Sequence, residues 1–310
     1  LVTELSSGGS DKEYLHVDTH PTSPSLDNVY LCWHDDNVQK FARSTDRGLT
    51  FGTVLTIDAG ASGIGCDLTS DSVGRVHYVF PRTSNGGDIR IATSTDGGAS
   101  FGAATTVADT LGNFDFALPS METRNVFIYV SADVDLSNGP FKDSIYVAFT
   151  DNTGPDSANP NNNHGRVRVA FRRAGSGTWT VTSPHSSADA NTVDRYQQWL
   201  RVDDQGRVHV IFYDTRHSVN RTGVDLYYNV SNDGAQTWGT PIRLTAVTSP
   251  NITDGFEWGD YQGLDLLMND VIAIYTDNRN EGGGGAQSVD VYAVAGFNGP
   301  GDGLFANGFE

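Results

Sequence analysis

The stretch Ser44-Thr45-Asp46-Arg47-Gly48-Leu49-Thr50-Phe51 occurs three times in this chain with small variations. It returns as Ser-Thr-Asp-Gly-Gly-Ala-Ser-Phe at 94–101 and as Ser-Asn-Asp-Gly-Ala-Gln-Thr-Trp at 231–238. The Asp and Ser side chains can bond N–H groups of their own turn, and Gly adopts a positive φ where one is needed. The pattern therefore predicts a folded turn between two strands, which its last, aromatic residue holds onto the sheets. We call each copy a box turn.

Three such matches in register resemble the Asp-box, or BNR-repeat, family of β-propellers, which is best known from sialidases. The resemblance implies a propeller fold and a carbohydrate-related activity. In that family the boxes lie on the face opposite the active site, so the resemblance places the site of this chain away from its box turns.

The residues in front of the box turns repeat as well. Each unit has an apolar strand, an Asp-centred turn, a second apolar strand, a loop and a third strand. The first strands of the units begin at Tyr14, Asp67, Tyr129, Trp199 and Tyr261. Five such units predict an all-β fold, a five-bladed β-propeller of four-stranded antiparallel blades, with six blades as the alternative.

The two ends of the chain are expected to play different parts. The last repeat stops after its third strand, and residues 1–5 could supply the missing outer strand. We expect the propeller to span residues 1–300. Residues 301–310 resemble a short C-terminal tag found on many exported bacterial proteins.

The composition restricts the partners of the chain. Among 310 residues, 38 are acidic and 20 basic, which gives a net charge of −18. Such a charge argues against nucleic acid and anionic membranes as partners, and a neutral or cationic ligand is easier to host. No apolar run is long enough to span a bilayer, and Leu1 does not open a signal peptide.

Cys32 and Cys66 are the only cysteines. The repeat places them at the same rim of neighbouring blades, so an inter-blade disulfide and two buried thiols both remain open. Together with the C-terminal tag, the cysteine count predicts a mature secreted or periplasmic protein.

The loops between the second and third strands are expected on the face opposite the box turns. We expect them to be long and unlike one another, with residues 151–165 as the extreme case. Variable loops on a rigid scaffold commonly carry binding sites. We therefore place the functional site on this face.

The starts of the innermost strands form a ring of candidate residues at the mouth of the central channel. Aromatic side chains there can stack on the apolar faces of sugar rings. Packing of the channel mouth is the alternative for each of them. Asp67 interrupts the aromatic pattern and is a candidate catalytic carboxylate. The aromatic members of this ring are Tyr14, Tyr129, Trp199 and Tyr261.

The link that precedes Tyr261 is the densest group of candidates, with Glu257, Trp258 and Asp260 in one short stretch. Most glycosidases use two carboxyl groups, one as an acid and one as a base or nucleophile. The resemblance to sialidases implies a different arrangement, in which Tyr261 acts as nucleophile beside Glu257 and arginines grip a substrate carboxylate. The Arg-Ile-Pro-type motif that precedes the first box in sialidases is replaced here by Phe41-Ala42-Arg43.

Further candidates come from departures within the repeat. Asp36 adds a second carboxylate after His34-Asp35, and it joins the catalytic candidates. Polar or carboxylate-binding roles are expected for His34, Arg82, Arg195, Arg216 and Arg279. No cofactor is required and no metal site is predicted. A structural calcium ion is possible at residues 133–139 or 151–156, where oxygen-bearing side chains are dense.

We expect an exported carbohydrate-active enzyme, a sialidase-like glycoside hydrolase that acts on a glycan or polysaccharide. One alternative is a non-catalytic propeller that binds glycan or protein through the same face. Another is a polysaccharide lyase, in which His34 or Tyr261 abstracts a proton beside a uronate held by arginine. The sequence leaves the oligomeric state open.

Overall fold

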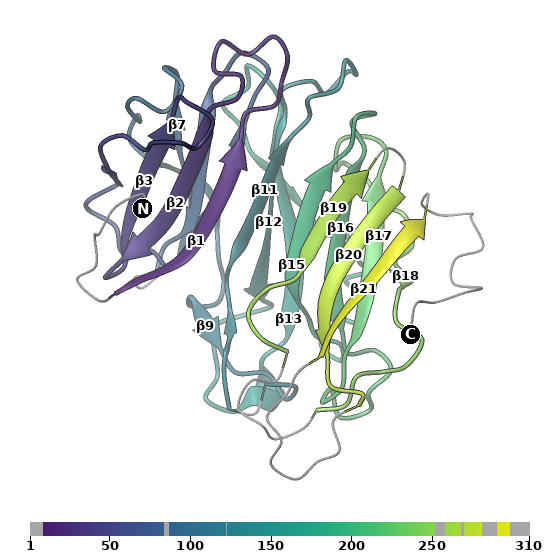
Figure 1. The fold of residues 1–310 in the computed structure, drawn as a ribbon. Helices are drawn as coiled ribbons and strands as arrows, with labels where there is room; N and C mark the ends of the chain where they lie inside the picture. The colour runs from purple at the N-terminus through teal and green to yellow at the C-terminus, as the bar shows by residue number, and fades with distance from the viewer. Residues whose placement is uncertain are drawn as a thin grey trace.

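The structure is a computed structural model that describes residues 9–83, 87–121, 123–251, 258–267, 270–280 and 290–297. Its antiparallel sheets are arranged around a common axis, like the blades of a propeller (Figure 1). Within each blade the strands follow one another from the centre outward in chain order.

The first blade consists of β1 (Ser10–Val17), β2 (Val29–Asp35), β3 (Val38–Ser44) and β4 (Leu55–Ile57), and the second of β5 (Asp67–Ser70), β6 (Val76–Pro81), β7 (Asp88–Ser94) and β8 (Thr105–Asp109). The third blade consists of β11 (Val130–Val134), β12 (Ile145–Asn152), β13 (Gly165–Arg172) and β14 (Thr180–Thr182), and the fourth of β15 (Arg195–Val202), β16 (Val208–Asp214), β17 (Asp225–Ser231) and β18 (Ile242–Arg243). The fifth blade consists of β19 (Gly263–Leu267), β20 (Asp270–Asp277) and β21 (Asp290–Phe297). Two short strands, β9 (Asp115–Phe116) and β10 (Val126–Phe127), link the second and third blades, and the 3-10 helix η1 (Pro160–Asn162) lies between β12 and β13.

The five-bladed propeller predicted from the repeats is confirmed, and the six-bladed alternative is not what the described residues form. The fifth blade has three described strands, as the repeat without a box turn predicts. The outer strand expected from residues 1–5 and the tail at 301–310 lie outside the described residues.

The blades pack face to face because their central strands carry apolar side chains toward both neighbours. Between the first two blades, Tyr30, Phe41 and Tyr78 are completely buried. The fifth blade packs onto the main core through the face that carries Val271 and Tyr275. Large aromatic side chains thus fill the wedge between adjacent sheets, which fixes their radial arrangement.

The box turns adopt the predicted conformation. In the first, Asp46 Oδ1 accepts hydrogen bonds from the Ser44 hydroxyl at 2.6 Å and the Thr50 N–H at 2.8 Å, and Asp46 Oδ2 accepts one from the Thr50 hydroxyl at 2.6 Å. Equivalent bonds surround Asp96 and Asp233. Each box turn therefore stabilises the connection between the third and fourth strands of its blade.

The loops between second and third strands differ from the expectation in the first blade. There β2 and β3 are joined by the two-residue turn Asp36–Asn37, with φ angles of 47° and 64°. Asp and Asn tolerate this left-handed conformation, which suits a tight hairpin. In the third blade the ladder ends at the pair Asn152 and Gly165, and the long loop predicted there is present.

Cys32 and Cys66 form a disulfide that joins the first blade to the segment in front of β5, with their Cα atoms 6.4 Å apart. Of the two possibilities that the sequence left open, the inter-blade disulfide is the one found. No helix in the described part of the chain is long and apolar enough to cross a membrane.

Candidate functional site

Four aromatic side chains from different blades meet at the mouth of the channel. The ring centroid of Tyr14 lies 5.6 Å from that of Trp199 and 5.7 Å from that of Tyr261. Tyr129 lies 5.5 Å from Tyr261. The aromatic ring predicted from the strand starts is thus assembled by the first, third, fourth and fifth blades.

A left-handed residue stands two positions before the ring residue in four of the five blades. In the second and fifth blades it is a glycine, Gly65 with φ 77° and Gly259 with φ 67°. In the first and fourth it is Lys12 with φ 60° and Gln197 with φ 50°. A non-glycine residue pays about 1–2 kcal/mol for this conformation. In the first and fourth blades this strain accompanies a polar side chain where the second and fifth blades have glycine.

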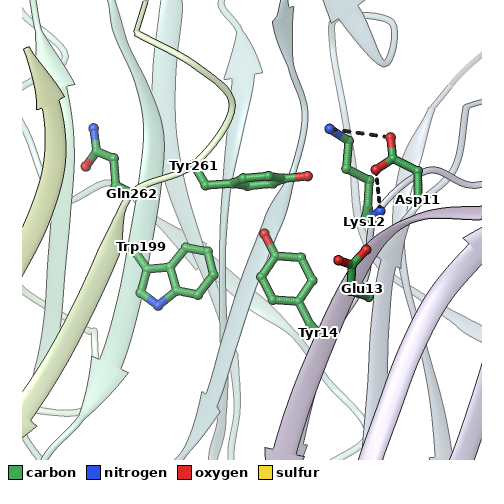
Figure 2. A pocket seen from close by; sticks show the side chains of 7 residues that line it. All are labelled: Asp11, Lys12, Glu13, Tyr14, Trp199, Tyr261 and Gln262. Carbon is green, nitrogen blue, oxygen red and sulfur yellow. Dashed lines mark hydrogen bonds and ion pairs between the residues drawn. The ribbon is translucent and has the colours of Figure 1, made fainter. Parts of the chain in front are cut away.

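Both non-glycine positions lie in β-bulges. The pairing of β1 with β2 shifts between Asp11 and Tyr14, and that of β15 with β16 shifts between Tyr196 and Trp199. A bulge bends the strand and redirects its side chains. In the first blade the bulge turns three consecutive charged residues, 11–13, toward the channel mouth (Figure 2).

Lys12 is the centre of an ion cluster below the aromatic rings. Its Nζ atom lies 2.7 Å from Asp260 Oδ2, and 5.0 and 5.4 Å from the ring centroids of Tyr261 and Tyr129. Asp260 also pairs with Arg124 through its other oxygen. Burial opposes the charge of Lys12, but the bonds to Asp260 and Tyr261 outweigh it and raise the pKa of the ammonium group. Lys12 therefore remains charged.

A pocket of about 300 Å³ opens beside this cluster (Figure 2). Its volume is at the lower end of the range typical of small-molecule sites. Aromatic rings form one wall and the charged residues of β1 the other. The pocket is lined by Asp11, Lys12, Glu13, Tyr14, Trp199, Tyr261 and Gln262.

The aromatic lining of this pocket is predicted from the sequence. The sequence pattern does not predict the other lining residues, Asp11, Lys12, Glu13 and Gln262. The repeat register contains a signal for one of them. Lys12 aligns with Gly65 and Gly259, so a charged side chain stands where two other repeats have glycine.

Asp67 lies at the start of β5 but does not line the pocket. Its Oδ2 accepts a hydrogen bond from the Ala132 N–H at 2.7 Å and its Oδ1 one from the Leu68 N–H at 2.8 Å. Burial raises the pKa of this carboxyl to about 6, although Arg201 acts in the opposite direction. Asp133 bonds the backbone of β15 in the same way, through the Val202 N–H at 2.8 Å. Both carboxyls thus tie neighbouring innermost strands together.

The remaining candidates from the first two blades also lie apart from the pocket lining. Asp36 is exposed in the hairpin turn. His34 is buried, accepts a hydrogen bond from the Gly65 N–H at 3.4 Å, and has a pKa lowered by burial. Arg82 pairs with Asp88 at 2.7 Å.

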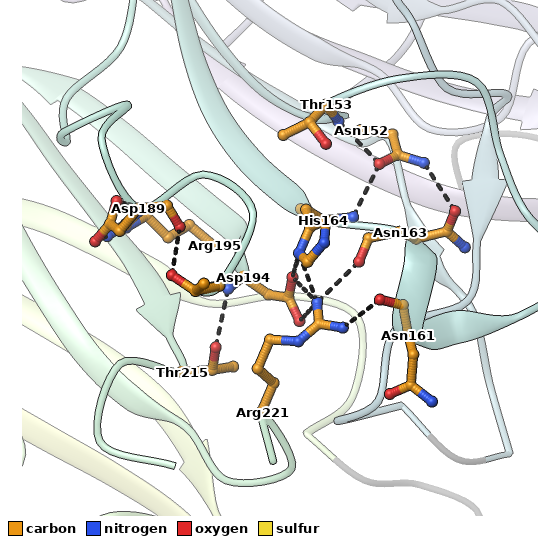
Figure 3. Close-up of polar contacts among 12 residues, drawn as sticks. Asn152, Thr153, Asn161, Asn163, His164, Asp189, Asp194, Arg195, Thr215 and Arg221 are labelled. Carbon is orange, nitrogen blue, oxygen red and sulfur yellow. Dashed lines mark hydrogen bonds and ion pairs between the residues drawn. The ribbon is translucent and has the colours of Figure 1, made fainter. Parts of the chain in front are cut away.

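Two arginines of the fourth blade belong to a polar network (Figure 3). Arg195 begins β15, and Arg221 lies in the loop between β16 and β17. The buried Arg195 bonds Asp214 at 2.7 Å and Asp189 at 2.6 Å. Arg221 bonds Asp194 at 2.7 Å and the carbonyl of Asn163 at 2.8 Å. These charges hold the long loops against each other.

Arg216 and Arg279 repeat one local arrangement. Each pairs with the aspartate two residues earlier, at 2.7 Å for Asp214 and 2.6 Å for Asp277, and each lies over a tyrosine ring. Neither lines the pocket, so the structure does not bring them to the aromatic ring.

Of the candidates in the link before β19, Trp258 lies elsewhere than expected, and Glu257 is not described. Trp258 is fully buried in the core, where its indole N–H bonds the Ser249 hydroxyl at 2.9 Å. It therefore cannot serve as a wall for a ligand. Glu257 lies outside the described residues.

The two stretches proposed to hold calcium contain side-chain oxygen atoms that are bonded within the protein. Asp135 Oδ1 accepts the Ser137 N–H at 2.8 Å, and Asp151 Oδ2 pairs with Arg168 at 2.8 Å. Within the described ranges, no group of three or more His, Cys, Asp or Glu side chains could hold a metal ion.

Comparisons with known proteins relate this chain to others through its fold. No family model and no curated protein matches the sequence. Among solved structures, an alpha-L-arabinanase of Penicillium chrysogenum in complex with arabinobiose has a TM-score of 0.55 and 13% identity, over 89% of this chain and 80% of that one. A Hadza microbial sialidase has a TM-score of 0.53 and 10% identity, over 92% of this chain and 56% of that one. A protein of unknown function from Dyadobacter fermentans has a TM-score of 0.50 and 12% identity, over 87% and 80%.

Proposed function

We propose that the protein is an exported glycoside hydrolase that binds one sugar ring of a glycan in the mouth pocket. The observation that carries the proposal is one pocket at the propeller mouth whose lining combines an aromatic wall with the carboxylates of Asp11 and Glu13, next to Asp260. The disulfide supports export, because such bonds persist in oxidising compartments.

The aromatic wall supplies binding. Tyr14, Trp199 and Tyr261 come from three blades, and their relative positions are fixed by direct ring contacts. Rigid rings offer the apolar C–H face of a sugar a large contact area at a small cost in conformational entropy.

Two carboxylates on either side of Lys12 supply the chemistry. Asp260 bonds both Lys12 and Arg124 and lines a smaller cavity that shares Tyr14, Trp199 and Tyr261 with the pocket; it is the proposed nucleophile. Asp11, which lines the pocket 3.7 Å from Lys12 Nζ, is the proposed proton donor. Tyr261 suits a binding role better than a nucleophilic one, because burial raises its pKa.

The position of Lys12 limits the distance between the two carboxylates. Its Nζ atom lies 3.7 Å from Asp11 Oδ2 and 2.7 Å from Asp260 Oδ2, so these oxygens cannot be farther apart than the sum of the two distances. Retaining glycosidases place their carboxyl groups about 5–5.5 Å apart and inverting ones about 6.5–9.5 Å apart. The spacing favours retention of anomeric configuration.

The test is a screen for new reducing ends on a panel of glycans, followed by proton NMR of the first anomer released. We expect Asp260→Asn and Asp11→Asn to lower kcat by at least about a hundredfold, as loss of a proton-transfer group does. Trp199→Ala should mainly raise KM. Release of the inverted anomer would exclude the proposed pair.

A second candidate function is non-catalytic glycan binding, and the tight pairing of Asp260 favours it. In this second candidate function, Asp260 has a purely structural role: its bonds to Lys12 and Arg124 hold the mouth together. In that case the wild type would retain glycans on an affinity column, the loss of Trp199 would abolish retention, and neither reducing ends nor unsaturated products would form.

A further inference from the structure

We infer that the mouth pocket selects neutral sugars and rejects sugars that carry a carboxylate, such as sialic acids and uronates. The inference deepens the proposed function and rests on it. Its central observation is that Lys12, the one cation among the described residues of the pocket lining, is already paired with Asp260, while an acidic residue, Glu13, lines the same pocket.

Three of the arginines that the sequence offers as carboxylate-binding groups are paired with aspartates. Arg195, Arg216 and Arg279 each bond an aspartate at 2.6–2.7 Å. None of them is among the residues that line the pocket. Displacing such a buried pair for a substrate would leave an aspartate unpaired, which is unfavourable.

Of the described residues that line the pocket, Lys12 alone is a cation, and its ammonium group is paired as well. Its side chain is only 13% exposed, and Asp260, Asp11 and the faces of two tyrosines surround its ammonium group. Its charge balances the mouth and is not available to a ligand.

Negative charges outnumber positive charges among the described residues of the pocket lining. Asp11 and Glu13 stand against the single charge of Lys12 in the lining. Glu13 is exposed and forms no hydrogen bond or ion pair with the part of the chain that the structure describes. A second carboxylate brought next to it would be repelled.

The experiment compares glycans that differ only in the carboxylate. The wild type is titrated on an array that contains lactose-type and sialyllactose-type glycans, together with uronate polysaccharides and their carboxyl-reduced forms. We expect the neutral member of each bound pair to bind at least tenfold more tightly. Preference for the acidic member would overturn the inference and leave the proposed function standing, whereas no binding to any glycan would overturn both.

Variants of Glu13 test the assigned cause. Glu13→Gln removes the negative charge of this side chain and Glu13→Lys reverses it. The two variants should therefore reduce the preference for neutral over acidic glycans stepwise, by at least fivefold for Glu13→Lys. The matched control is Asp109→Asn, which removes one exposed charge from the end of β8 in the second blade. A control that narrows the preference as much as Glu13→Gln would attribute the selectivity to net charge and contradict the role of Glu13.

Discussion

Arg47 occupies a position at which both other box turns have glycine. Its φ of 64° matches those of Gly97 at 64° and Gly234 at 68°. The side chain is 80% exposed and pairs with Asp27, a contact of small value at the surface. The shared geometry of the turn therefore holds Arg47 in a strained backbone conformation.

Replacing Arg47 by glycine should stabilise the protein by about 0.5–1 kcal/mol, since relief of the left-handed strain exceeds the added entropy of the unfolded chain. Arg47→Ala is the control, because it removes the ion pair and keeps the strain. Urea unfolding of both variants measures the difference. Equal stability of the two would contradict the strain argument.

Asp67 should make stability depend on pH. Its pKa of about 6 in the folded protein exceeds the ordinary value of 3.8, so the folded state binds more protons between these values. The free energy of unfolding therefore falls as the pH rises from about 4 to 6, by up to roughly 3 kcal/mol, and then levels off. Urea titrations of wild type and Asp67→Asn should differ in this slope. The same slope in both would show that another group is responsible.

At the scale of elements, the bulge in β1 determines which of its side chains line the pocket at the channel mouth. The same position is relaxed in the blades that carry Gly65 and Gly259, and strained in those with Lys12 and Gln197. Strand pairing on both sides of the bulge holds the strained residue in place. The proposed site thus lies where the repeat departs from its most stable form.

Lys12→Gly and Lys12→Met separate backbone strain from side-chain charge. Both variants should lose at least tenfold in glycan affinity, because Asp260 is no longer held beside the pocket. Lys12→Gly should be more stable than Lys12→Met by about 1 kcal/mol, since only glycine relieves the left-handed conformation. Thermal unfolding and glycan titration measure the two effects. If the two variants were equally stable, the strain at this bulge would be negligible.

The site was predictable only where it follows the repeat. Tyr14, Trp199 and Tyr261 were found because the register of the box turns aligns them. Asp11 and Glu13 were missed because a bulge shifts which side chains face the channel, and sequence periodicity assumes regular strands. Arg216 and Arg279 each pair with the aspartate two residues earlier, a local contact that the Asp-x-Arg spacing in the sequence already allows.

At the scale of the whole molecule, the fold was predictable because the same local pattern recurs in every blade. Turn chemistry, alternation of apolar residues and the position of the box turns all agree, and such agreement between levels specifies a structure. The disulfide could not be decided in this way, because it depends on how two blades meet. It joins residues 34 positions apart in sequence.

Removing the disulfide by Cys32→Ser with Cys66→Ser should lower the free energy of unfolding by about 3–4 kcal/mol, as expected for closing a loop of this length. Both sulfur-bearing residues are buried, so part of the loss comes from packing. The control is wild type unfolded with and without reductant, which isolates the covalent bond. A reductant effect below about 1 kcal/mol would mean that packing alone joins the two blades.

The buried ion cluster at the mouth bears on the salinity in which the protein can work. The side chains of Lys12 and Asp260 are each 13% exposed, and dissolved salt screens such charges far less than those at the surface. Other carboxylates, among them Asp36, Asp109 and Asp115, are exposed, and added salt weakens the repulsion between such surface charges. Rising ionic strength should therefore relax the exterior while the binding mouth keeps its shape, from fresh water to brine.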